Sequence, residues 1–306
     1  MLLKINISRL PNIVWFAQNT KLDYQGSKPL PKYLQEDALQ IDAYGTAKTA
    51  FFEKIRTKKG IKKMQSLQRY LHEIEPLFTT HWRSAAPHLS LWKEYLLAHE
   101  RTLQKILTTL YNLTSTRSFT ARHIPFYLIA DPTNPTQELS AWFSWTPKKS
   151  FVVIEIPLAA IPSQTLFPVG IVAHEILHLL LRKNIRLFTE LKNLAKDNAK
   201  LWLKTSDLPI SPENFLEELL VSSFVPEGYL GEKYLQHKIK RLVMLPNDLL
   251  DWRRLIAYHM RTIARNYAEK NKAIDLKYME YLLEVIKKIP HQFPDEGGRR
   301  RAIISD

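Results

Sequence analysis

The chain has no cysteine among its 306 residues. Disulfide bonds and metal sites built on thiolates are therefore excluded, and any metal ion must be held by His, Asp or Glu side chains. This absence does not fix the cellular compartment, because a reducing cytosol and an oxidising exterior both permit a protein without cysteine.

Long uninterrupted apolar runs are also missing. Near the N-terminus, Lys4, Arg9 and Pro11 interrupt the apolar residues, so no secretory signal peptide of the usual length is recognisable. The uncharged stretch 156–173 contains three prolines and leads directly into a His-Glu pair. We interpret it as a loop followed by a buried helix rather than as a membrane span. The sequence therefore predicts a protein without a membrane span that resides in the cytoplasm.

Positive charge is in clear excess, with a formal net charge of +14 at pH 7. Such an excess invites a nucleic-acid-binding interpretation. The charge is spread over much of the chain, however, and its densest clusters are short, at residues 54–63 and 299–301. A solvated Lys-rich surface explains this distribution, so binding of nucleic acid or of an acidic protein is kept as an alternative.

The spacing of apolar residues predicts an α+β protein that is predominantly helical. Helical spacing runs through residues 31–57, 61–78, 88–113, 186–204, 211–224, 229–243, 247–270 and 274–289. We expect three regions in one compact two-lobed unit. These are a helical region 1–115, a core of strands and helices 116–226, and a second helical region 227–306.

Three short segments rich in aromatic and β-branched residues, 123–131, 140–147 and 150–157, are separated by turn formers and predict three strands. The last two are expected to form a hairpin. The third segment, SFVVIEIP, is a candidate edge strand that lines a cleft, where an extended peptide could add by backbone hydrogen bonds.

After these strands, the apolar stretch 169–183 contains the sequence HEILH, with His174, Glu175 and His178. Two histidines four residues apart lie on one face of a helix, where both imidazoles can bind one divalent cation. Glu175 lies beside that face, where a general base would take a proton from a metal-activated water. Buried polar groups need partners, and a metal supplies them. The alternative is a pair of core histidines satisfied by carbonyl groups, beside a structural glutamate.

This HExxH pattern, with strands before it and a second helix after it, resembles the zincin metallopeptidases over about residues 120–226. The resemblance implies a zincin-like core in which a small sheet precedes the active-site helix. The metzincin extension requires Gly and His where this chain has Leu181 and Asn184, so that subgroup is excluded. The gluzincin arrangement takes its third metal ligand from a later helix, which here offers Glu217 and Glu218.

The two glutamates are adjacent on a helix and point about 100° apart, so they cannot both face the metal. Ser222 follows Glu218 by four residues and could donate a hydrogen bond that orients the metal ligands, whereas Val221 has that spacing from Glu217. Glu218 is therefore predicted as the third metal ligand, with Glu217 as the alternative.

Gluzincins, by resemblance, often use a Tyr or His beyond the glutamate helix to stabilise the oxyanion that forms during hydrolysis. Tyr229 and His237 are the main candidates in this chain, and His259 is a further one. Each is also compatible with an ordinary surface or core position, because a catalytic role depends on tertiary geometry.

The sequence thus predicts a Zn²⁺-dependent peptidase that hydrolyses a peptide or protein substrate. His174, His178 and Glu218 would bind the metal, and Glu175 would act as the general base. The alternative is a basic nucleic-acid- or protein-binding protein in which the zinc site is structural or vestigial. A regulatory peptidase restricted to a single target would have the same sequence features.

Overall fold

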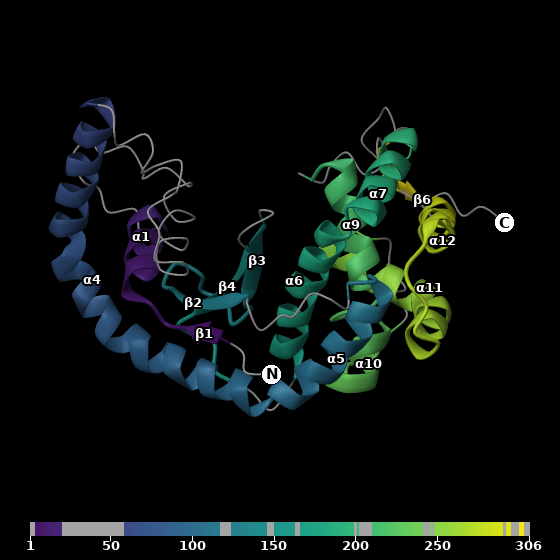
Figure 1. Cartoon of the computed structure of the whole chain (residues 1–306), viewed down its shortest axis with the longest axis horizontal. Coiled ribbons are helices and arrows are strands. Elements are labelled where there is room, and N and C mark those ends of the chain that lie inside the picture. The colour runs from purple at the N-terminus through teal and green to yellow at the C-terminus, as the bar shows by residue number, and fades with distance from the viewer. Residues whose placement is uncertain are drawn as a thin grey trace. The chain divides into compact units, whose positions relative to one another are not determined.

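Figure 1 shows a computed structural model of the chain. The structure describes residues 4–19, 58–116, 124–145, 150–162, 166–198, 201, 210–240, 246, 248–289, 292–294 and 300–302. Over these residues the protein is mostly helical and contains one small mixed sheet, which confirms the α+β class. Within the same residues, no helix combines the length and the apolar character needed to cross a membrane.

The chain divides into two compact units. One contains Met1–Glu100 and Ala121–Gln164, and the other contains Arg101–Thr120 and Thr165–Asp306. The three regions expected from the sequence stay a prediction. The sheet and the helix with HEILH, which that prediction placed in one region, belong to different units.

The first unit contains a four-stranded sheet in the order β1 (Lys4–Asn6), β2 (Pro125–Asp131), β4 (Ser150–Pro157) and β3 (Ser140–Trp145). Strands β1, β2 and β4 run parallel, and β3 pairs antiparallel with β4, which confirms the predicted hairpin. The prediction that SFVVIEIP is an edge strand is wrong, because β4 lies between β2 and β3. Its almost continuous apolar sequence is typical of a strand that is buried on both faces.

Two helices accompany this sheet. Helix α1 (Arg9–Asn19) was not predicted; its Trp15 packs in a cluster with residues of β2 and β4, among them Tyr127 and Phe151. Helix α4 (Lys58–Ala98) continues through Pro76 and Pro87, so the interruption expected between residues 78 and 88 is wrong. A proline inside a helix removes one hydrogen bond. A buried stripe at helical spacing runs past both prolines and favours the continuous helix: Ile74, Phe78, Ala85, Leu89, Trp92 and Leu96.

The second unit is built from helices. They are α5 (Glu100–Leu113), α6 (Phe167–Lys183), α7 (Ile185–Asp197), α9 (Pro212–Ser222), α10 (Tyr229–Leu235), α11 (Leu249–Glu269) and α12 (Leu276–Lys288). The predicted helix 88–113 is divided between α4 and α5, and the predicted helix 229–243 ends early as α10. The helix predicted over residues 31–57 lies outside the described residues. Two short strands, β5 (Gln292–Pro294) and β6 (Arg300–Ala302), pair antiparallel.

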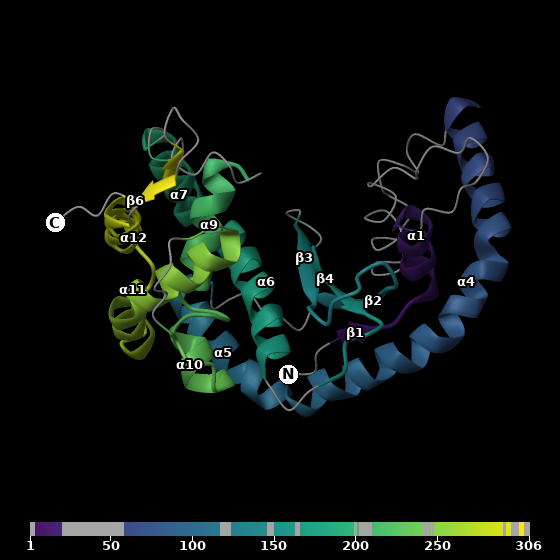
Figure 2. The same ribbon diagram turned by 180° about the vertical axis from the view of Figure 1, so that it is seen from behind.

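Helix α6 forms the buried centre of this unit. Of its 17 residues, 13 are buried, which explains why its sequence is apolar on nearly every side. Helices α7, α9 and α10 pack against it, and α11 packs in turn on α9 and α10, as Figure 2 shows from behind. The titratable side chains in the middle of α6, those of His174, Glu175 and His178, are therefore buried.

Candidate metal centre

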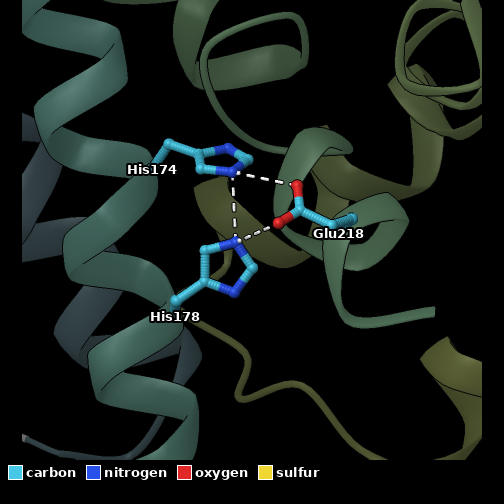
Figure 3. Close-up of side chains that lie close together, drawn as sticks. All are labelled: His174, His178 and Glu218. Atoms are coloured by element: carbon cyan, nitrogen blue, oxygen red, sulfur yellow. Dashed lines mark hydrogen bonds and ion pairs between the residues drawn. The ribbon is translucent and has the colours of Figure 1, made fainter. Parts of the chain in front are cut away.

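Helix α6 places the two histidines of HEILH on one face. The rings of His174 and His178 lie 4.7 Å apart between centroids, and each residue is 3% exposed. Pro168 occupies the first turn of the helix, where a missing N–H is tolerated. The four-residue spacing and the apolar flanks of this segment therefore put both imidazoles side by side in the interior (Figure 3).

Helix α9 brings the carboxylates. It begins as the sequence predicted: the Ser211 hydroxyl accepts a hydrogen bond from the Asn214 backbone N–H, and Pro212 follows as the first helical residue. The helix packs on α6 and directs Glu218 at the two imidazoles (Figure 3). The side chain of Glu217 is 2% exposed and that of Glu218 is 23% exposed.

The Nδ1 atom of each imidazole, the ring nitrogen on the side away from Glu218, lies at hydrogen-bond distance from an acceptor. Nδ1 of His174 lies 3.0 Å from the carbonyl oxygen of Val225, and Nδ1 of His178 lies 2.8 Å from Oε1 of Glu217. A carbonyl or carboxylate oxygen can only accept, so in the neutral rings Nδ1 carries the hydrogen and donates it. The Nε2 atoms of both rings are then left with lone pairs and no hydrogen.

Those two Nε2 atoms converge with the Glu218 carboxylate. They lie 3.1 Å from each other, and each lies 3.2 Å from one oxygen of Glu218. Two ligand atoms bound to zinc at tetrahedral angles are separated by about 3.3 Å, given bonds of roughly 2.0–2.2 Å. Among the described residues, His174, His178 and Glu218 are the group of His, Asp and Glu side chains that could hold a metal ion. Three acceptors thus face one another at the spacing that a bound cation requires.

Glu217 has a separate role on the far side of His178. Its Oε1 accepts the His178 Nδ1–H, while the Arg182 guanidinium donates to the same carboxylate from Nε at 3.2 Å and from Nη2 at 3.0 Å. A carboxylate on the outer nitrogen of a metal-binding histidine fixes the ring orientation and makes the ring more basic. The two adjacent glutamates therefore approach the same imidazole from opposite sides.

The argument that favoured Glu218 through Ser222 is wrong. The Ser222 hydroxyl is fully buried and has no hydrogen-bond partner among the described residues, so it orients no ligand. Glu218 reaches the imidazoles because of the direction in which α9 presents it, and Glu217 takes the orienting position instead.

The loop after α9 serves the His174 side. Its Val225 carbonyl accepts from His174, and its Glu227, which is 2% exposed, forms an ion pair with Arg253 of α11 at 3.0 Å. The loop is folded tightly: a Cβ atom on Gly228 would lie 2.0 Å from the Ser223 carbonyl oxygen. Only glycine fits at this position, which holds the carbonyl and the carboxylate in place.

Glu175 lies in the interior beside the histidines and is 8% exposed. Burial raises the pKa of its carboxyl, whereas the charges of His174, His178 and Arg253 act in the opposite direction and that of Glu218 adds to the increase. A buried carboxyl with a raised pKa is suited to accept and release a proton.

The electrostatics of the cluster call for positive charge. Burial works to lower the pKa of His178, but the carboxylates of Glu218 and Glu217 outweigh it and raise the pKa to about 10. Burial works to raise the pKa of Glu218, but His178 and His174 hold it well below its usual range. With both imidazoles neutral, as metal binding requires, the four carboxylates and two guanidiniums around them carry a net charge of minus two: Glu175, Glu217, Glu218, Glu227, Arg182 and Arg253.

The predicted oxyanion stabilisers have their described contacts with residues other than His174, His178 and Glu218. The Tyr229 hydroxyl donates to Glu269 at 2.6 Å, and burial together with that carboxylate raises its pKa. The ring of His237 packs against Phe167, and burial lowers its pKa while Glu227 opposes the shift. His259 is exposed beside Tyr258. The side chains of the two basic clusters, 54–63 and 299–301, lie outside the described residues.

Three residues of the site were missed in the sequence. Arg182 follows His178 by four residues on the same helix, so the spacing could have revealed it. Glu227 and Arg253 come from a loop and a distant helix, and no local pattern links them to HEILH. In comparisons with protein-family models, curated proteins and solved structures, nothing matches this chain.

Proposed function

We propose that the protein is a zinc-dependent peptidase with its metal held by His174, His178 and Glu218. The observation that carries the proposal is the convergence of two imidazole Nε2 atoms and the Glu218 carboxylate at 3.1–3.2 Å. Apposed lone pairs repel one another unless a cation lies between them. A divalent cation would also balance the net charge of minus two around the imidazoles.

The donor set favours zinc over other divalent ions. Two imidazole nitrogens with one carboxylate are the ligands of catalytic zinc sites, whereas magnesium and calcium prefer oxygen ligands alone. Three protein ligands distinguish a catalytic zinc site from a structural one, which has four. With only these three residues as ligands, a bound zinc would leave a position for water and would lower the pKa of that water to near neutrality.

The residues of the chain supply the other parts of a hydrolytic reaction. The Glu175 carboxylate accepts a proton of the attacking water and passes it to the nitrogen of the leaving amine. Val225 and Glu217 hold the two rings so that their Nε2 atoms face one point. Burial among apolar residues of α6 keeps bulk water from competing at that point.

The likeness to gluzincins in this proposal rests on helices α6 and α9. They supply an HExxH pair and a later glutamate, at residues 174, 178 and 218. The departure from the gluzincin pattern is Ser222, where many members have an acidic residue that orients a ligand. Glu217 supplies an equivalent carboxylate from the position directly before the third ligand.

The test combines metal content with cleavage of a fluorogenic peptide library. We expect about one zinc per chain by elemental analysis and slow but measurable cleavage by the zinc-loaded protein. Glu175→Gln should keep the zinc and lose at least about a hundredfold in cleavage, because it removes only the general base. Glu190→Gln on α7, where the carboxylate pairs with Arg186, is the matched control and should leave cleavage unchanged.

Two results would overturn the proposal. Purified protein that neither contains nor takes up zinc excludes the metal centre. Cleavage that persists at full rate in Glu175→Gln protein excludes this site as its source. Zinc binding without any cleavage of the library would reduce the proposal to a metal-binding protein.

A further inference from the structure

Arg253 is a charged residue that the proposed reaction does not use. It lies on α11, and its Nη2 is 3.0 Å from Oε1 and 3.2 Å from Oε2 of Glu227. The same nitrogen is 3.5 Å from Nδ1 of His174. With one-fifth of its side chain exposed, the guanidinium reaches the edge of the metal centre.

This guanidinium is not saturated by its partner. Its Nε is buried and has no hydrogen-bond partner among the described residues. Arg182 makes the opposite arrangement, because it donates to Glu217 from both Nε and Nη2. A buried N–H without an acceptor costs free energy, which a ligand that offers an acceptor can recover.

The position of Arg253 limits what this acceptor can be. The guanidinium faces Nδ1 of His174, which is the ring nitrogen turned away from Glu218 and toward Val225. It therefore lies beside the three converging acceptors rather than over them. A group that it binds would neighbour the scissile bond and would not be the oxygen that gains charge during hydrolysis.

A carboxylate is the best match for a guanidinium whose Nε has no acceptor among the described residues. Guanidinium groups bind carboxylates through charge-assisted hydrogen bonds, often from two nitrogens at once. Glu227 is buried and has its backbone in the tightly folded loop, so it holds the Arg253 side chain without needing a ligand. The arginine is thus positioned in advance, which lowers the entropic cost of binding an anion.

We propose that Arg253, held by Glu227, binds a carboxylate of the substrate next to the scissile bond. The preferred substrates are then peptides that carry either a free C-terminal carboxylate or an acidic side chain at that place. This inference rests on the peptidase function proposed above and adds the substrate class to it.

The experiment measures binding, so that it does not depend on turnover. Zinc-loaded Glu175→Gln protein is titrated calorimetrically with three probes: N-acetyl-Phe-Ala with a free C-terminus, its C-terminal amide, and N-acetyl-Phe-Glu amide. We expect one of the two carboxylate probes to bind at least about tenfold more tightly than the neutral amide. Preference for the first probe identifies a terminal carboxylate as the ligand, and preference for the third identifies an acidic side chain.

Variants then connect the preference to Arg253. Arg253→Gln alone leaves Glu227 buried without its partner, so the double variant Arg253→Gln, Glu227→Gln is compared as well, with thermal melting as the check on folding. Both should retain zinc and bind the three probes equally. Arg254→Gln changes the neighbouring, half-exposed arginine and should keep the tenfold preference.

The proposal is overturned if the amide binds as tightly as both carboxylates, if no probe binds while zinc is held, or if the double variant keeps the preference. These outcomes leave the zinc-peptidase proposal intact. Failure of the protein to bind zinc overturns that proposal instead, and the two failures are therefore distinguishable.

Discussion

The two histidines of the candidate metal centre have different surroundings although they lie one helical turn apart. His178 donates to a carboxylate, and that carboxylate is gripped by Arg182 from two nitrogens. His174 donates from Nδ1 to the neutral carbonyl of Val225, and the Arg253 guanidinium lies 3.5 Å from the same nitrogen. One ring is thus made more basic, while the other lies beside a cation.

This difference suggests separate roles for the two sides: the His178 side would hold a metal ligand in place, and the His174 side would bind the substrate. On the His178 side Glu217 accepts from the ring and from both Nε and Nη2 of Arg182, so that side would serve to hold a metal ligand in place. On the His174 side the Nε of Arg253 has no partner among the described residues, so that side can still bind something from outside. The site is asymmetric because only one of its flanks is complete without a substrate.

The largest effect on zinc content should come from removing both histidine ligands. Replacing His174 and His178 together by Ala should reduce zinc content from about one equivalent to none and remove the stabilisation that zinc confers on the folded state. Elemental analysis and melting temperatures with and without zinc provide the measurement. His259→Ala, at an exposed position, is the control. Stoichiometric zinc in the double variant would falsify the assignment of the ligands.

Breaking the ion pair on the His174 side should cost the most stability of any single change proposed here. Glu227→Ala leaves Arg253 largely buried without its carboxylate, for which we expect a loss of about 3 kcal/mol in the free energy of unfolding. Urea denaturation in the presence of a chelator measures this without a contribution from metal. Glu232→Ala breaks the exposed pair with Arg261 and should cost less than about 1 kcal/mol. Equal costs for the two variants would contradict the structural role of Glu227.

Replacing each of the two adjacent glutamates should weaken zinc binding, but to different extents. Glu218→Gln removes a metal ligand, whereas Glu217→Gln removes only the acceptor behind His178 and should weaken zinc binding by about 10- to 100-fold. Competition with a chromophoric chelator gives both affinities. A smaller effect for Glu218→Gln than for Glu217→Gln would reverse the roles of the two residues.

Changing the two arginines should sharpen the comparison further. Arg182→Gln loosens the grip on Glu217 and should weaken zinc binding by up to about tenfold. Arg253→Gln combined with Glu227→Gln should change zinc affinity by less than about threefold. Neither residue places a carboxylate on a ring nitrogen of a metal ligand, as Glu217 does at His178. Equal losses of zinc affinity would show that both flanks support the metal in the same way.

The smallest effect on zinc affinity is expected at Ser222, whose hydroxyl forms a hydrogen bond with neither the Glu217–Arg182 pair beside His178 nor the Glu227–Arg253 pair beside His174. Its hydroxyl is buried without a partner among the described residues, so Ser222→Ala should leave zinc affinity unchanged and alter the free energy of unfolding by no more than about 1 kcal/mol. Chelator competition and urea denaturation check both expectations. A drop in zinc affinity would restore Ser222 as an orienting residue.

The sequence predicted those parts of the site that depend on local spacing. The HEILH spacing indicated that His174 and His178 share a helical face, and Ser211 with Pro212 marked the start of α9. Glu218 was chosen for a reason that the structure contradicts, because Ser222 orients nothing. Adjacent residues on a helix differ only in direction, and that direction depends on how α9 packs against α6.

Other features were beyond reach because they depend on distant segments. The position of β4 inside the sheet follows from its pairing with β2 and β3, and β1 with α1 reaches the sheet from the other end of the sequence. An edge strand and a central strand can have equally apolar sequences when both faces of the sheet are covered. The pair of Glu227 and Arg253 joins a loop to a helix, so only the tertiary structure reveals it.

The span of chain between the two helices of the site has a kinetic consequence. His178 is separated by 39 residues from Glu217, the residue before the ligand Glu218, so a metal bound to both helices would close a long loop of chain like a reversible cross-link. The entropy lost on closing such a loop grows only with the logarithm of its length. Most of this entropy is lost when the two helices pack together during folding, before a metal binds. Opening the loaded protein, however, requires the coordinate bonds to break first. The half-life of the folded chain, more than its equilibrium stability, should therefore record whether the site is loaded.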